Sequence, residues 1–535
     1  MELDQSDSIV PLSDGDDGTV PQDGGDSTGD GNGTDDGTGT GDGTGTGDGT
    51  GTGDGTGTGD GTGTGDDTDS GDVTPSTGTG NSSSGGSTTT TTPTTTTTST
   101  LTPYQQFTKD LNNGVKTIYL TGNMKISKPF DIKYKVVIDG KGHYIDAQKK
   151  TFIFKVYSTS VTFKNIFFKN GKSDKGGAIW GYKSTVNLNN CTFASNRVTD
   201  SGGAIYMYCG TLNIAKSTFK YNFALNNGGA IYVSTARLVI KNSKFANNKV
   251  QSGKKLGHGG AVNTYKGSSY IAKTSFTSNI CNSTALKKHS QATKYQFAGG
   301  AVYYYLGSSH TLTGCTFISN KASNHGGAVY ACKPKLMKVY NTTFKYSRTM
   351  FEDGGAMTFN GQKLILNKST FYKNLAYEDG GVMDSCSLTT KKINIIITGC
   401  TFNANTAYKG AGAFWIGKKT IFSLYNNKFI NNQSGMGGAI LSEVGVVTIK
   451  KCLFQGNKAK NIPKWTVKTK SGKILKHYGG AIMIQKQNVK IVSCTFKKNS
   501  AAQGGAIYHQ GGKMTLSANK FSGNVAKKGA KIQKA

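Results

Sequence analysis

A two-part phrase repeats along most of this chain, and it limits the possible folds more than any other feature. Most copies hold Phe-x-x-Asn and, a few residues later, Gly-Gly-Ala followed by an aliphatic residue, from Phe167 to Ala530, and Ser347 takes the place of one Asn. Self-similarity at a fixed period of this length indicates a solenoid, in which each copy is one structural unit stacked on the last. The second glycines of the complete copies are Gly177, Gly203, Gly229, Gly260, Gly300, Gly327, Gly355, Gly381, Gly412, Gly438, Gly480 and Gly505.

Within a copy, the local pattern is typical of short strands. Residues 230–233, 237–240 and 243–245 are β-branched or aromatic, and Gly, Asn, Ser and Lys separate such segments. Apart from a short capping helix near Tyr104 to Leu111, no part of the body has a sustained apolar helical period. The sequence therefore predicts an all-β fold, a parallel β-helix of about 14 coils of about 25 residues each.

Stacking turns each repeated position into a column of like residues, spaced ~4.8 Å apart. We expect the Phe of each phrase to stack inside the coil. We expect the Asn to lie in a turn, to tolerate left-handed backbone and to bond the Asn of the next coil. The paired glycines would supply positive φ or a close approach between coils. Long insertions before Gly260, Gly300 and Gly480 all enter at this one corner.

The phrase resembles the repeat of the chlamydial polymorphic membrane proteins and of the adhesin-like surface proteins of methanogenic archaea, over residues 136–530. The segment Val136 to Gly142 also resembles the first coils of the pectin-lyase-like superfamily. The resemblance implies a right-handed β-helix of the pectin-lyase-like kind and an extracellular, adhesive role at a cell surface. No apolar run is long enough to span a bilayer, so we expect no transmembrane segment in this chain.

Residues 1–102 are of a different kind, with 19 acidic residues, no Lys or Arg, a Gly-Asp-Gly-Thr-Gly-Thr period and a Thr run at 88–99. Such a segment cannot bury a core. The period is similar to calcium-binding glycine–aspartate repeats, but it lacks the apolar residue that lets such turns stack. We predict a disordered acidic stalk or linker at 1–102, and a β-helix domain at 103–535 with a short N-terminal cap at about 104–135.

The two ends of the chain carry expectations of their own. Met1 is followed by acidic and polar residues without a visible signal peptide. The last residues stop in the middle of a coil, and an uncapped coil exposes core and strand edge. We therefore expect a missing segment or a partner at the C-terminal coil.

The charge of the body bears on its partners. All 63 Lys and Arg of the chain fall after residue 100, against 12 Asp and Glu there, and nearly all the basic residues are Lys. Lys lacks the planar fork used in bidentate recognition, so we expect no specific nucleic-acid binding, and a diffuse attraction to anionic polymers instead. The alternative is a solvated lysine surface that keeps a repetitive sheet protein from pairing with itself.

The nine cysteines follow the repeat, since most lie two residues before the Phe, where other copies place Ser or Asn. They are expected to fill a column as small, mildly apolar residues. No Cys-x-x-Cys occurs, and we expect neither a dedicated metal site nor a cofactor.

An aromatic column is the main candidate for ligand binding. Its members lie three residues after a second glycine, and an aliphatic or aromatic residue precedes each: Trp180, Tyr206, Tyr232, Tyr303, Tyr330, Trp415 and Tyr508. Strand alternation places the two columns on opposite faces. If the preceding residues point inward, the rings form an exposed stripe interleaved with lysines and suited to stacking against sugars. The alternative is that the rings stack on one another for stability alone.

Acidic residues cluster in two successive copies, at Glu352, Asp353, Glu378, Asp379 and Asp384. Stacking brings such pairs near the ~5 Å separation of retaining glycosidase carboxylates. Asp174, Asp200 and Asn226, however, occupy the same corner of other copies. A turn-forming role, a cation site and catalysis are therefore three alternatives.

The inserted loops are the last candidate site. Residues 458–476 surround Trp465 with lysines, among them Lys464 and Lys468, and the loop at 280–298 enters at the same corner. Loops on a rigid scaffold often carry recognition, so a basic binding edge is predicted, although a variable loop also arises by drift.

Together these features predict an extracellular adhesin-like surface protein, not an enzyme, that binds glycans or anionic surface polymers through a β-helix face and corner loops. The alternatives are a polysaccharide-degrading lyase or hydrolase on the same scaffold, and a passive structural spacer.

Overall fold

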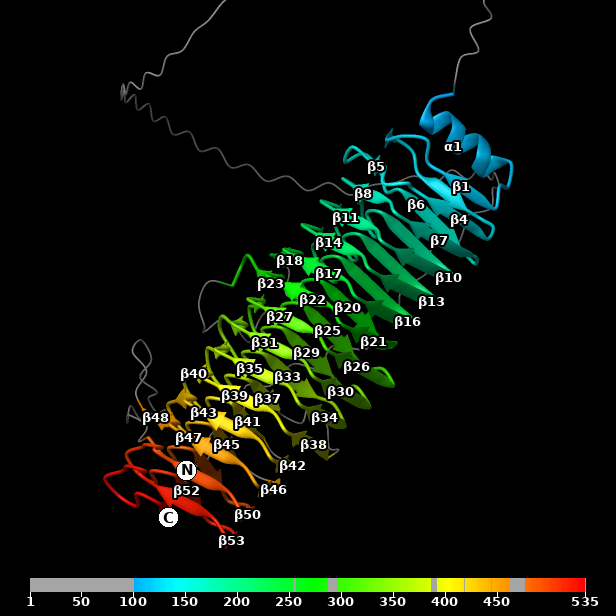
Figure 1. Ribbon diagram of the computed structural model, residues 1–535. Coiled ribbons are helices and arrows are strands. Elements are labelled where there is room, and N and C mark those ends of the chain that lie inside the picture. The colour runs from blue at the N-terminus through cyan, green and yellow to red at the C-terminus, as the bar shows by residue number, and fades with distance from the viewer. Residues whose placement is uncertain are drawn as a thin grey trace, which may run out of the picture. The chain divides into compact units, whose positions relative to one another are not determined.

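The protein is a right-handed parallel β-helix of about 14 turns, as the repeat and the resemblance predict. The structure is a computed structural model, and it describes residues 101–253, 256–286, 296–385, 392–417, 419–443, 445–460 and 477–534. Figure 1 shows the coils stacked in chain order from helix α1 (Pro103–Asn112) toward strand β53 (Met514–Ser517). The predicted tail at 1–102 lies almost entirely outside the described residues.

Parallel strands of successive coils form three long sheets and one small one. The first sheet has 27 strands, and most coils contribute two of them. We call the strand that directly follows Gly-Gly-Ala the first limb, and the strand that follows the first limb along the chain the second limb. Its strands are β1 (Thr117–Tyr119), β3 (Phe130–Ile132), β4 (Val136–Asp139), β6 (Phe154–Tyr157), β7 (Ser160–Lys164), β10 (Ile179–Asn189), β13 (Ile205–Ala215), β16 (Ile231–Lys241), β20 (Val262–Tyr265), β21 (Ser268–Ala272), β25 (Val302–Tyr305), β26 (Ser309–Thr313), β29 (Val329–Cys332), β30 (Leu336–Tyr340), β33 (Met357–Asn360), β34 (Lys363–Asn367), β37 (Met383–Ser385), β38 (Ile393–Thr398), β41 (Phe414–Ile416), β42 (Thr420–Tyr425), β45 (Ile440–Ser442), β46 (Gly445–Lys450), β49 (Ile482–Gln485), β50 (Asn488–Val492), β52 (Ile507–Gln510), β53 and β55 (Ile532–Lys534).

The second sheet has 15 strands and carries the Phe of each phrase. Its strands are β2 (Met124–Lys125), β5 (Tyr144–Asp146), β8 (Phe167–Lys169), β11 (Thr192–Ala194), β14 (Thr218–Lys220), β17 (Lys244–Ala246), β22 (Ser275–Thr277), β27 (Thr316–Ile318), β31 (Thr343–Lys345), β35 (Thr370–Tyr372), β39 (Thr401–Asn403), β43 (Lys428–Ile430), β47 (Leu453–Gln455), β51 (Thr495–Lys497) and β54 (Lys520–Ser522).

The third sheet has 11 short strands, and it precedes the glycine pair. Its strands are β9 (Lys172–Ser173), β12 (Arg197–Val198), β15 (Phe223–Ala224), β18 (Lys249–Ser252), β23 (Ile280–Ser283), β28 (Lys321–Ala322), β32 (Arg348–Thr349), β36 (Leu375–Ala376), β40 (Thr406–Ala407), β44 (Gln433–Ser434) and β48 (Lys458–Ala459). The fourth sheet pairs β19 (Leu256–His258) with β24 (Gln296–Ala298). These two strands belong to successive insertions, so the described insertions do enter at one corner, as predicted.

A column of phenylalanines runs through the core, as predicted. Neighbouring rings stack with centroids 4.5–5.2 Å apart, from Phe168 to Phe521. The sequence pattern places the Phe of the first copy at Phe167, which is one residue too early. Phe168, and not Phe167, pairs with Phe193, because Phe167 occupies the outward position beside Thr192.

The Asn residues of the phrase form a buried ladder beside the Phe column, which Ser347 interrupts. The Asn196 side chain donates to Oδ1 of Asn222 at 2.9 Å and to the Phe168 carbonyl at 3.4 Å, and its backbone N–H donates to the same Oδ1 at 3.2 Å. Each amide is thereby satisfied inside the protein, which a buried polar group requires. The predicted bond between successive Asn residues is confirmed. The left-handed residue is the one before the Asn, such as Ser195 with φ 57°.

The two glycines of each pair have different roles, and both predicted roles occur. Gly202, the first, has φ 71°, where side chains are strained. Gly203, the second, has no such φ, but a Cβ on it would collide with the carbonyl oxygen of Gly229 in the next coil. The first glycine therefore makes the turn, and the second lets the coils approach.

The predicted capping helix is α1. Thr102 accepts a bond from the Gln105 N–H, the Gln105 side chain accepts in return from the Thr102 N–H, and Pro103 occupies the first turn. Phe107 is buried and packs edge-on against Phe130, with ring centroids 4.7 Å apart. The helix thus covers the open end of the Phe-rich core.

The cysteine column also lies where predicted. Its members Cys191, Cys315, Cys400, Cys452 and Cys494 are buried free thiols that share a column with residues such as Ser217 and Asn427. Cys386 lies outside the described residues.

Candidate functional site

The predicted aromatic column lies on the outer face of the first limb. Ile179, Ile205 and Ile231 point inward and are fully buried, while Trp180 and Tyr206 alternate with them and are half-buried. Tyr232 lies in the same column beside Tyr206, with ring centroids 5.2 Å apart. The predicted alternation is therefore confirmed.

The prediction of an exposed stripe is wrong for the later members of the column. Tyr303, Tyr330, Trp415 and Tyr508 are only 2%, 5%, 9% and 6% exposed. The turn before the glycine pair folds its own side chains over these rings. His258 stacks on Tyr303 at 4.2 Å, Tyr478 stacks on Tyr508 at 4.3 Å, and Trp415 packs in an apolar cluster with Met436.

The sequence reading missed a second aromatic column, two residues further along the same strands. Tyr157, Tyr182 and Tyr208 stack with centroids 5.0 and 5.7 Å apart. Strand alternation was the available signal, since residues two apart lie on one face. We call Tyr157, Trp180, Tyr182, Tyr206 and Tyr208 the aromatic face. It lies on strands β6, β10 and β13.

Lysines lie against the rings of the aromatic face. Nζ of Lys155 is 5.4 Å from the Trp180 ring, Nζ of Lys175 is 5.4 Å from the Tyr206 ring, and Nζ of Lys183 is 5.3 Å from the Tyr182 ring. Such distances allow a cation–π attraction. The tyrosine rings of each column lie 7° to 15° from parallel to one another, so each ring covers one face of the ring stacked on it.

Of the predicted corner loops, only parts are described. Lys464, Trp465 and Lys468 lie outside the described residues. In the loop at 280–298, Phe297 is fully buried against Val250 and Cys281, where it covers the third sheet. The described part of that loop therefore packs on its own scaffold.

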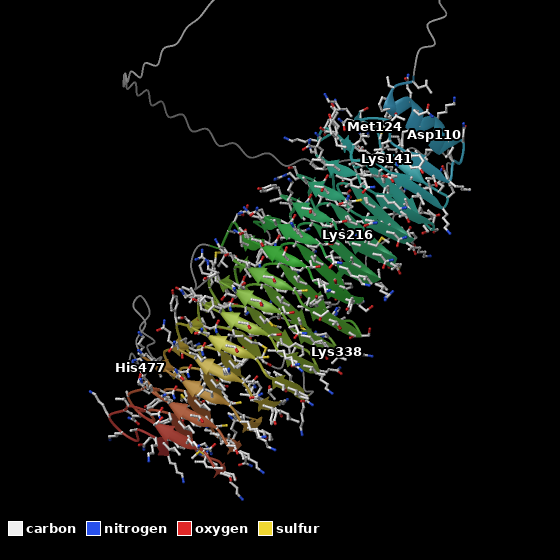
Figure 2. All side chains as sticks on the ribbon, in the orientation of Figure 1. Asp110, Met124, Lys141, Lys216, Lys338 and His477 are labelled. Atoms are coloured by element: carbon white, nitrogen blue, oxygen red, sulfur yellow. The ribbon has the colours of Figure 1, made fainter. Side chains whose placement is uncertain are left out.

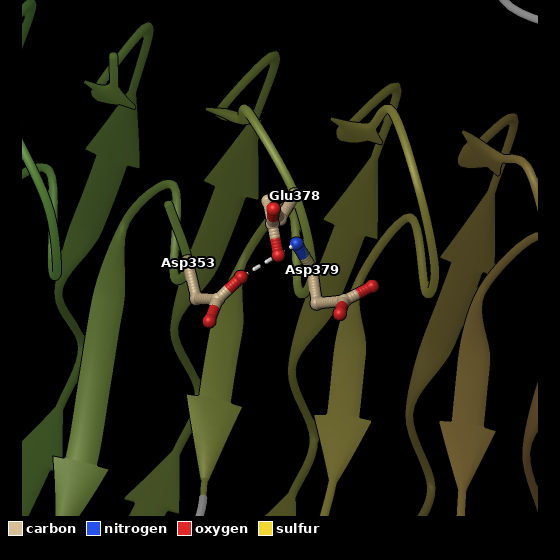
Figure 3. Close-up of side chains that lie close together, drawn as sticks. All are labelled: Asp353, Glu378 and Asp379. Carbon is tan, nitrogen blue, oxygen red and sulfur yellow. Dashed lines mark hydrogen bonds between the residues drawn. The ribbon is translucent and has the colours of Figure 1, made fainter. Parts of the chain in front are cut away.

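Glu352, Asp353, Glu378, Asp379 and Asp384 are brought together, and we call them the acidic corner. Glu352 and Asp353 precede one glycine pair, Glu378 and Asp379 precede the next, and Asp384 is the outward residue of β37. One oxygen each of Asp353, Glu378 and Asp379 lie within 4.8 Å of one another. Figure 3 shows these three side chains, with Asp353 Oδ1 accepting from the Asp379 N–H at 2.8 Å.

Two cationic side chains contact the acidic corner. Nε2 of His325 is 2.7 Å from Glu352, and Nζ of Lys409 is 3.2 Å from Glu378 and 3.7 Å from Asp379. Neither residue was predicted. Both occupy the turn before the glycine pair in coils next to the acidic ones, so the column register identifies them.

The carboxyl groups of the acidic corner are poorly solvated. Burial and the neighbouring carboxylate of Asp384 raise the pKa of Asp353 well above its usual value. Burial also raises the pKa of Asp379 well above its usual value, although Lys409 opposes the rise. Burial raises the pKa of Asp384 to about 7, with His325 opposing it. Oδ1 of Asp379 and Oδ1 of Asp384 have no hydrogen-bond partner among the residues that the structure describes. The corner therefore holds more negative charge than its surroundings stabilise.

Comparison with protein families agrees with this architecture. The family described as "Right handed beta helix region" matches residues 280–442 and 400–533, and the Chlamydia polymorphic membrane protein repeat matches residues 190–207 and 216–234. No curated protein and no solved structure gives a significant match. The chain is thus a right-handed β-helix protein that carries polymorphic-membrane-protein repeats, and such repeats are typical of surface proteins. These findings fit a surface-exposed, adhesin-like protein.

Within the described residues, the one helix, α1, is too short and too polar to cross a bilayer.

Proposed function

We propose that this extracellular, adhesin-like protein binds anionic glycans or other anionic surface polymers, and that its aromatic face makes the specific contacts. The observation that carries the proposal is the separation of charge along the body. The body has twelve acidic residues. Five form the acidic corner, a sixth is Glu443, and the other six lie from Asp110 to Asp200. Between residues 201 and 351 the chain has Lys and Arg but no Asp or Glu.

Positive charge without acidic neighbours attracts polyanions. Lys141 and Lys216 are exposed, and Figure 2 shows such side chains projecting from successive coils. Surface lysines alone would give a diffuse attraction that salt screens within ~8 Å. The aromatic face adds an ordered array of ammonium groups and ring edges at the coil spacing.

The ring geometry narrows the ligand class. A sugar that stacks on an aromatic ring needs an open ring face. Stacked neighbours cover at least one face of each tyrosine, and the ammonium groups of Lys175 and Lys183 lie over the Tyr206 and Tyr182 rings. Their edges and hydroxyl groups, with the adjacent Lys175 and Lys183 ammonium groups, are what a ligand meets. Hydroxyl and ammonium groups donate hydrogen bonds to sulfate, phosphate and carboxylate oxygens. The arrangement therefore favours an anionic ligand over a neutral one.

The test compares dextran sulfate, a carboxylated dextran and neutral dextran as ligands for the full chain, at low and at physiological salt. Replacing Lys155, Lys175 and Lys183 with Gln should weaken binding about 10-fold at physiological salt, or ~1.4 kcal/mol. The matched control replaces Lys216, Lys220 and Lys244, around β14 and β17, and should weaken it much less. If both variants lost the same amount of binding affinity, the aromatic face would have no specific role, and the protein would be a charged spacer. If neutral dextran bound as tightly as the anionic dextrans, sugar stacking would be supported instead.

A polysaccharide-degrading enzyme is the second candidate, because Asp353 and Glu378 lie near the ~5–5.5 Å separation of a retaining pair. The burial of Asp379 and Asp384, at 8% and 3% exposure, weighs against it, since a catalytic carboxylate must reach the substrate. Product analysis on every polysaccharide that binds is the test. Cleavage that is lost on Asp353→Asn would replace the proposed function with this one.

A further inference from the structure

We propose that the acidic corner binds one divalent cation of calcium's size through Asp353, Glu378 and Asp379, with the carboxylate of Asp384 beside them. This site is separate from the aromatic face, and it stands or falls independently of the polyanion binding proposed above.

The first argument is the balance of charge. Among the described residues, the ion pairs of this corner bring in two cations, His325 on Glu352 and Lys409 on Glu378 and Asp379. Asp353 and Asp384 have no cationic partner at ion-pair distance in the described parts of the chain. A buried carboxylate needs a counter-charge or a proton, because removing it from water is costly.

The second argument is the geometry of the oxygens. Calcium binds oxygen ligands at ~2.3–2.6 Å, so its ligands lie up to ~5 Å apart across the ion. The oxygens of Asp353, Glu378 and Asp379 lie within 4.8 Å of one another. Magnesium requires near-octahedral order at ~2.0–2.1 Å and usually keeps several of its waters, so a cluster of three protein carboxylates suits calcium better. The ligand atoms are carboxylate oxygens throughout, which suits a hard cation and not zinc or copper.

The third argument is independent of the cluster as such. Asp384 is 3% exposed, and its Oδ1 accepts no hydrogen bond from any residue that the structure describes. Asp379 is 8% exposed, and its Oδ1 likewise accepts no hydrogen bond from the described residues. Native proteins rarely leave a buried acceptor without a partner, and an ion is a common explanation when they do.

The neighbouring coil leaves room for Asp379 by having glycine at position 410. A Cβ on Gly410 would lie 2.7 Å from Oδ1 of Asp379, too close for a real contact. The equivalent position holds Asp353 and His325 in the two coils on the other side. Glycine thus keeps the approach to this oxygen open where the column otherwise carries a side chain.

The experiment uses terbium luminescence on the full chain. Asp384 pairs with Trp415 on the adjacent strands β37 and β41, so terbium at the acidic corner should emit when tryptophan is excited. Residues 1–100 contain no aromatic residue, so terbium bound by their acidic side chains stays dark. We expect a saturable signal that calcium displaces at least 10-fold more effectively than magnesium. Trp415→Phe should remove the signal but leave calorimetric calcium binding intact.

Two isosteric variants locate the ion. Asp379→Asn and Asp384→Asn should each weaken calcium binding at least 10-fold, and Asp200→Asn, at the same corner of an earlier coil, should leave it unchanged. The wild-type measurement needs no variant to fold, so it stands alone. No calcium-competed signal in the wild type would overturn the proposal. So would a signal that survives Trp415→Phe, or calcium binding that is unchanged in both aspartate variants.

Discussion

The turn before the glycine pair takes two forms in this protein, one in the early coils and one at the acidic corner. In the early form, Asp200 is half-exposed, its Oδ1 accepts from Asn226 at 2.8 Å and from Ser201 at 3.0 Å, and Lys175 lies 3.6 Å from its other oxygen. At the acidic corner, Asp379 occupies the next position of the same turn. It is buried, and one of its oxygens has no hydrogen-bond partner.

The difference follows from the outward residue of the first limb. Beside Asp200 that residue is Tyr206, whose ring fills the space outside the sheet and leaves the turn in water. At the acidic corner it is Thr358 or Asp384, which are small. The turn residues then fold inward, and Thr358 donates to the Asp353 carbonyl at 3.4 Å. A small outward residue therefore accompanies the buried polar turn of the acidic corner, although a turn residue can also be buried over a large ring, as His325 is beside Tyr330.

The largest effect should be common to both forms of the turn. Gly203→Ala and Gly381→Ala each place a Cβ against a carbonyl oxygen of the next coil, at Gly229 and Gly412. Since backbone cannot rotate away, we expect each to lower the free energy of unfolding by about 4 kcal/mol in denaturant titrations.

The control for these variants is Gly253→Ala, whose Cβ would meet only Thr284 Oγ1, at 3.4 Å. It should change stability by no more than ~0.5 kcal/mol. If Gly203→Ala were tolerated while Gly381→Ala was not, the two forms would differ in backbone and not only in side chains.

Much of this could be predicted from the sequence because a stacked repeat copies each position into a column. The short strands of each coil, the Phe column and the bond between successive Asn residues all follow from one periodic phrase. The backbone conformation of the turn was harder to predict, since the phrase does not indicate which residue has positive φ. In the structure it is the residue before the Asn.

The candidate site was less predictable, because burial on the outer face depends on what the neighbouring column does. The alternation that placed Tyr330 outside the sheet is right, but His325 in the preceding turn lies only 5.9 Å from its ring and helps cover it. The proximity of the five acidic residues could be predicted from their positions in successive copies of the repeat. The burial of Asp379 and Asp384 could not, since it depends on the small residue at Thr358 and on the missing side chain at Gly410.

The second prediction separates rings at the surface from rings under the turn. Tyr330→Ala should cost about 3 kcal/mol, because the ring is 5% exposed and its hydroxyl accepts from Asn360 at 3.1 Å. Tyr206→Ala should cost about 1 kcal/mol, because that ring is half-buried. Thermal and urea unfolding of both variants measures this, and equal costs would contradict the distinction.

The third prediction uses two histidines at equivalent positions of the turn. Burial lowers the pKa of His258 to about 4, where its Nδ1 lies 3.0 Å from Asn227 Oδ1. Burial alone would also lower the pKa of His325, but Glu352 raises it to about 9. The unfolded value for both is ~6.5.

The signs of the two effects are opposite. Below pH 6.5 the unfolded chain binds a proton that folded His258 refuses, so stability falls by about 3 kcal/mol between pH 6.5 and 4. Folded His325 keeps its proton, so its contribution is full below pH 6.5 and is lost as the pH rises to about 9. His258→Gln should flatten the acid side of the stability profile, and His325→Gln the alkaline side. A variant that flattens the wrong side would contradict the assigned environments.

The smallest and most specific expected effect concerns Asp384→Asn, whose effect on the free energy of unfolding should change sign when calcium is added. In excess chelator, Asp384→Asn removes one poorly compensated carboxylate from the acidic corner, so we expect it to stabilise the protein by about 1 kcal/mol. With calcium at 100 times its dissociation constant, the wild type should gain ~2.7 kcal/mol that the variant lacks, and the same substitution becomes destabilising. Asp200→Asn should change stability by no more than ~0.5 kcal/mol under either condition, because that carboxylate is solvated and paired. If Asp384→Asn behaves like Asp200→Asn in both buffers, the acids at 352–384 are another solvated turn, and the two forms of the corner are one.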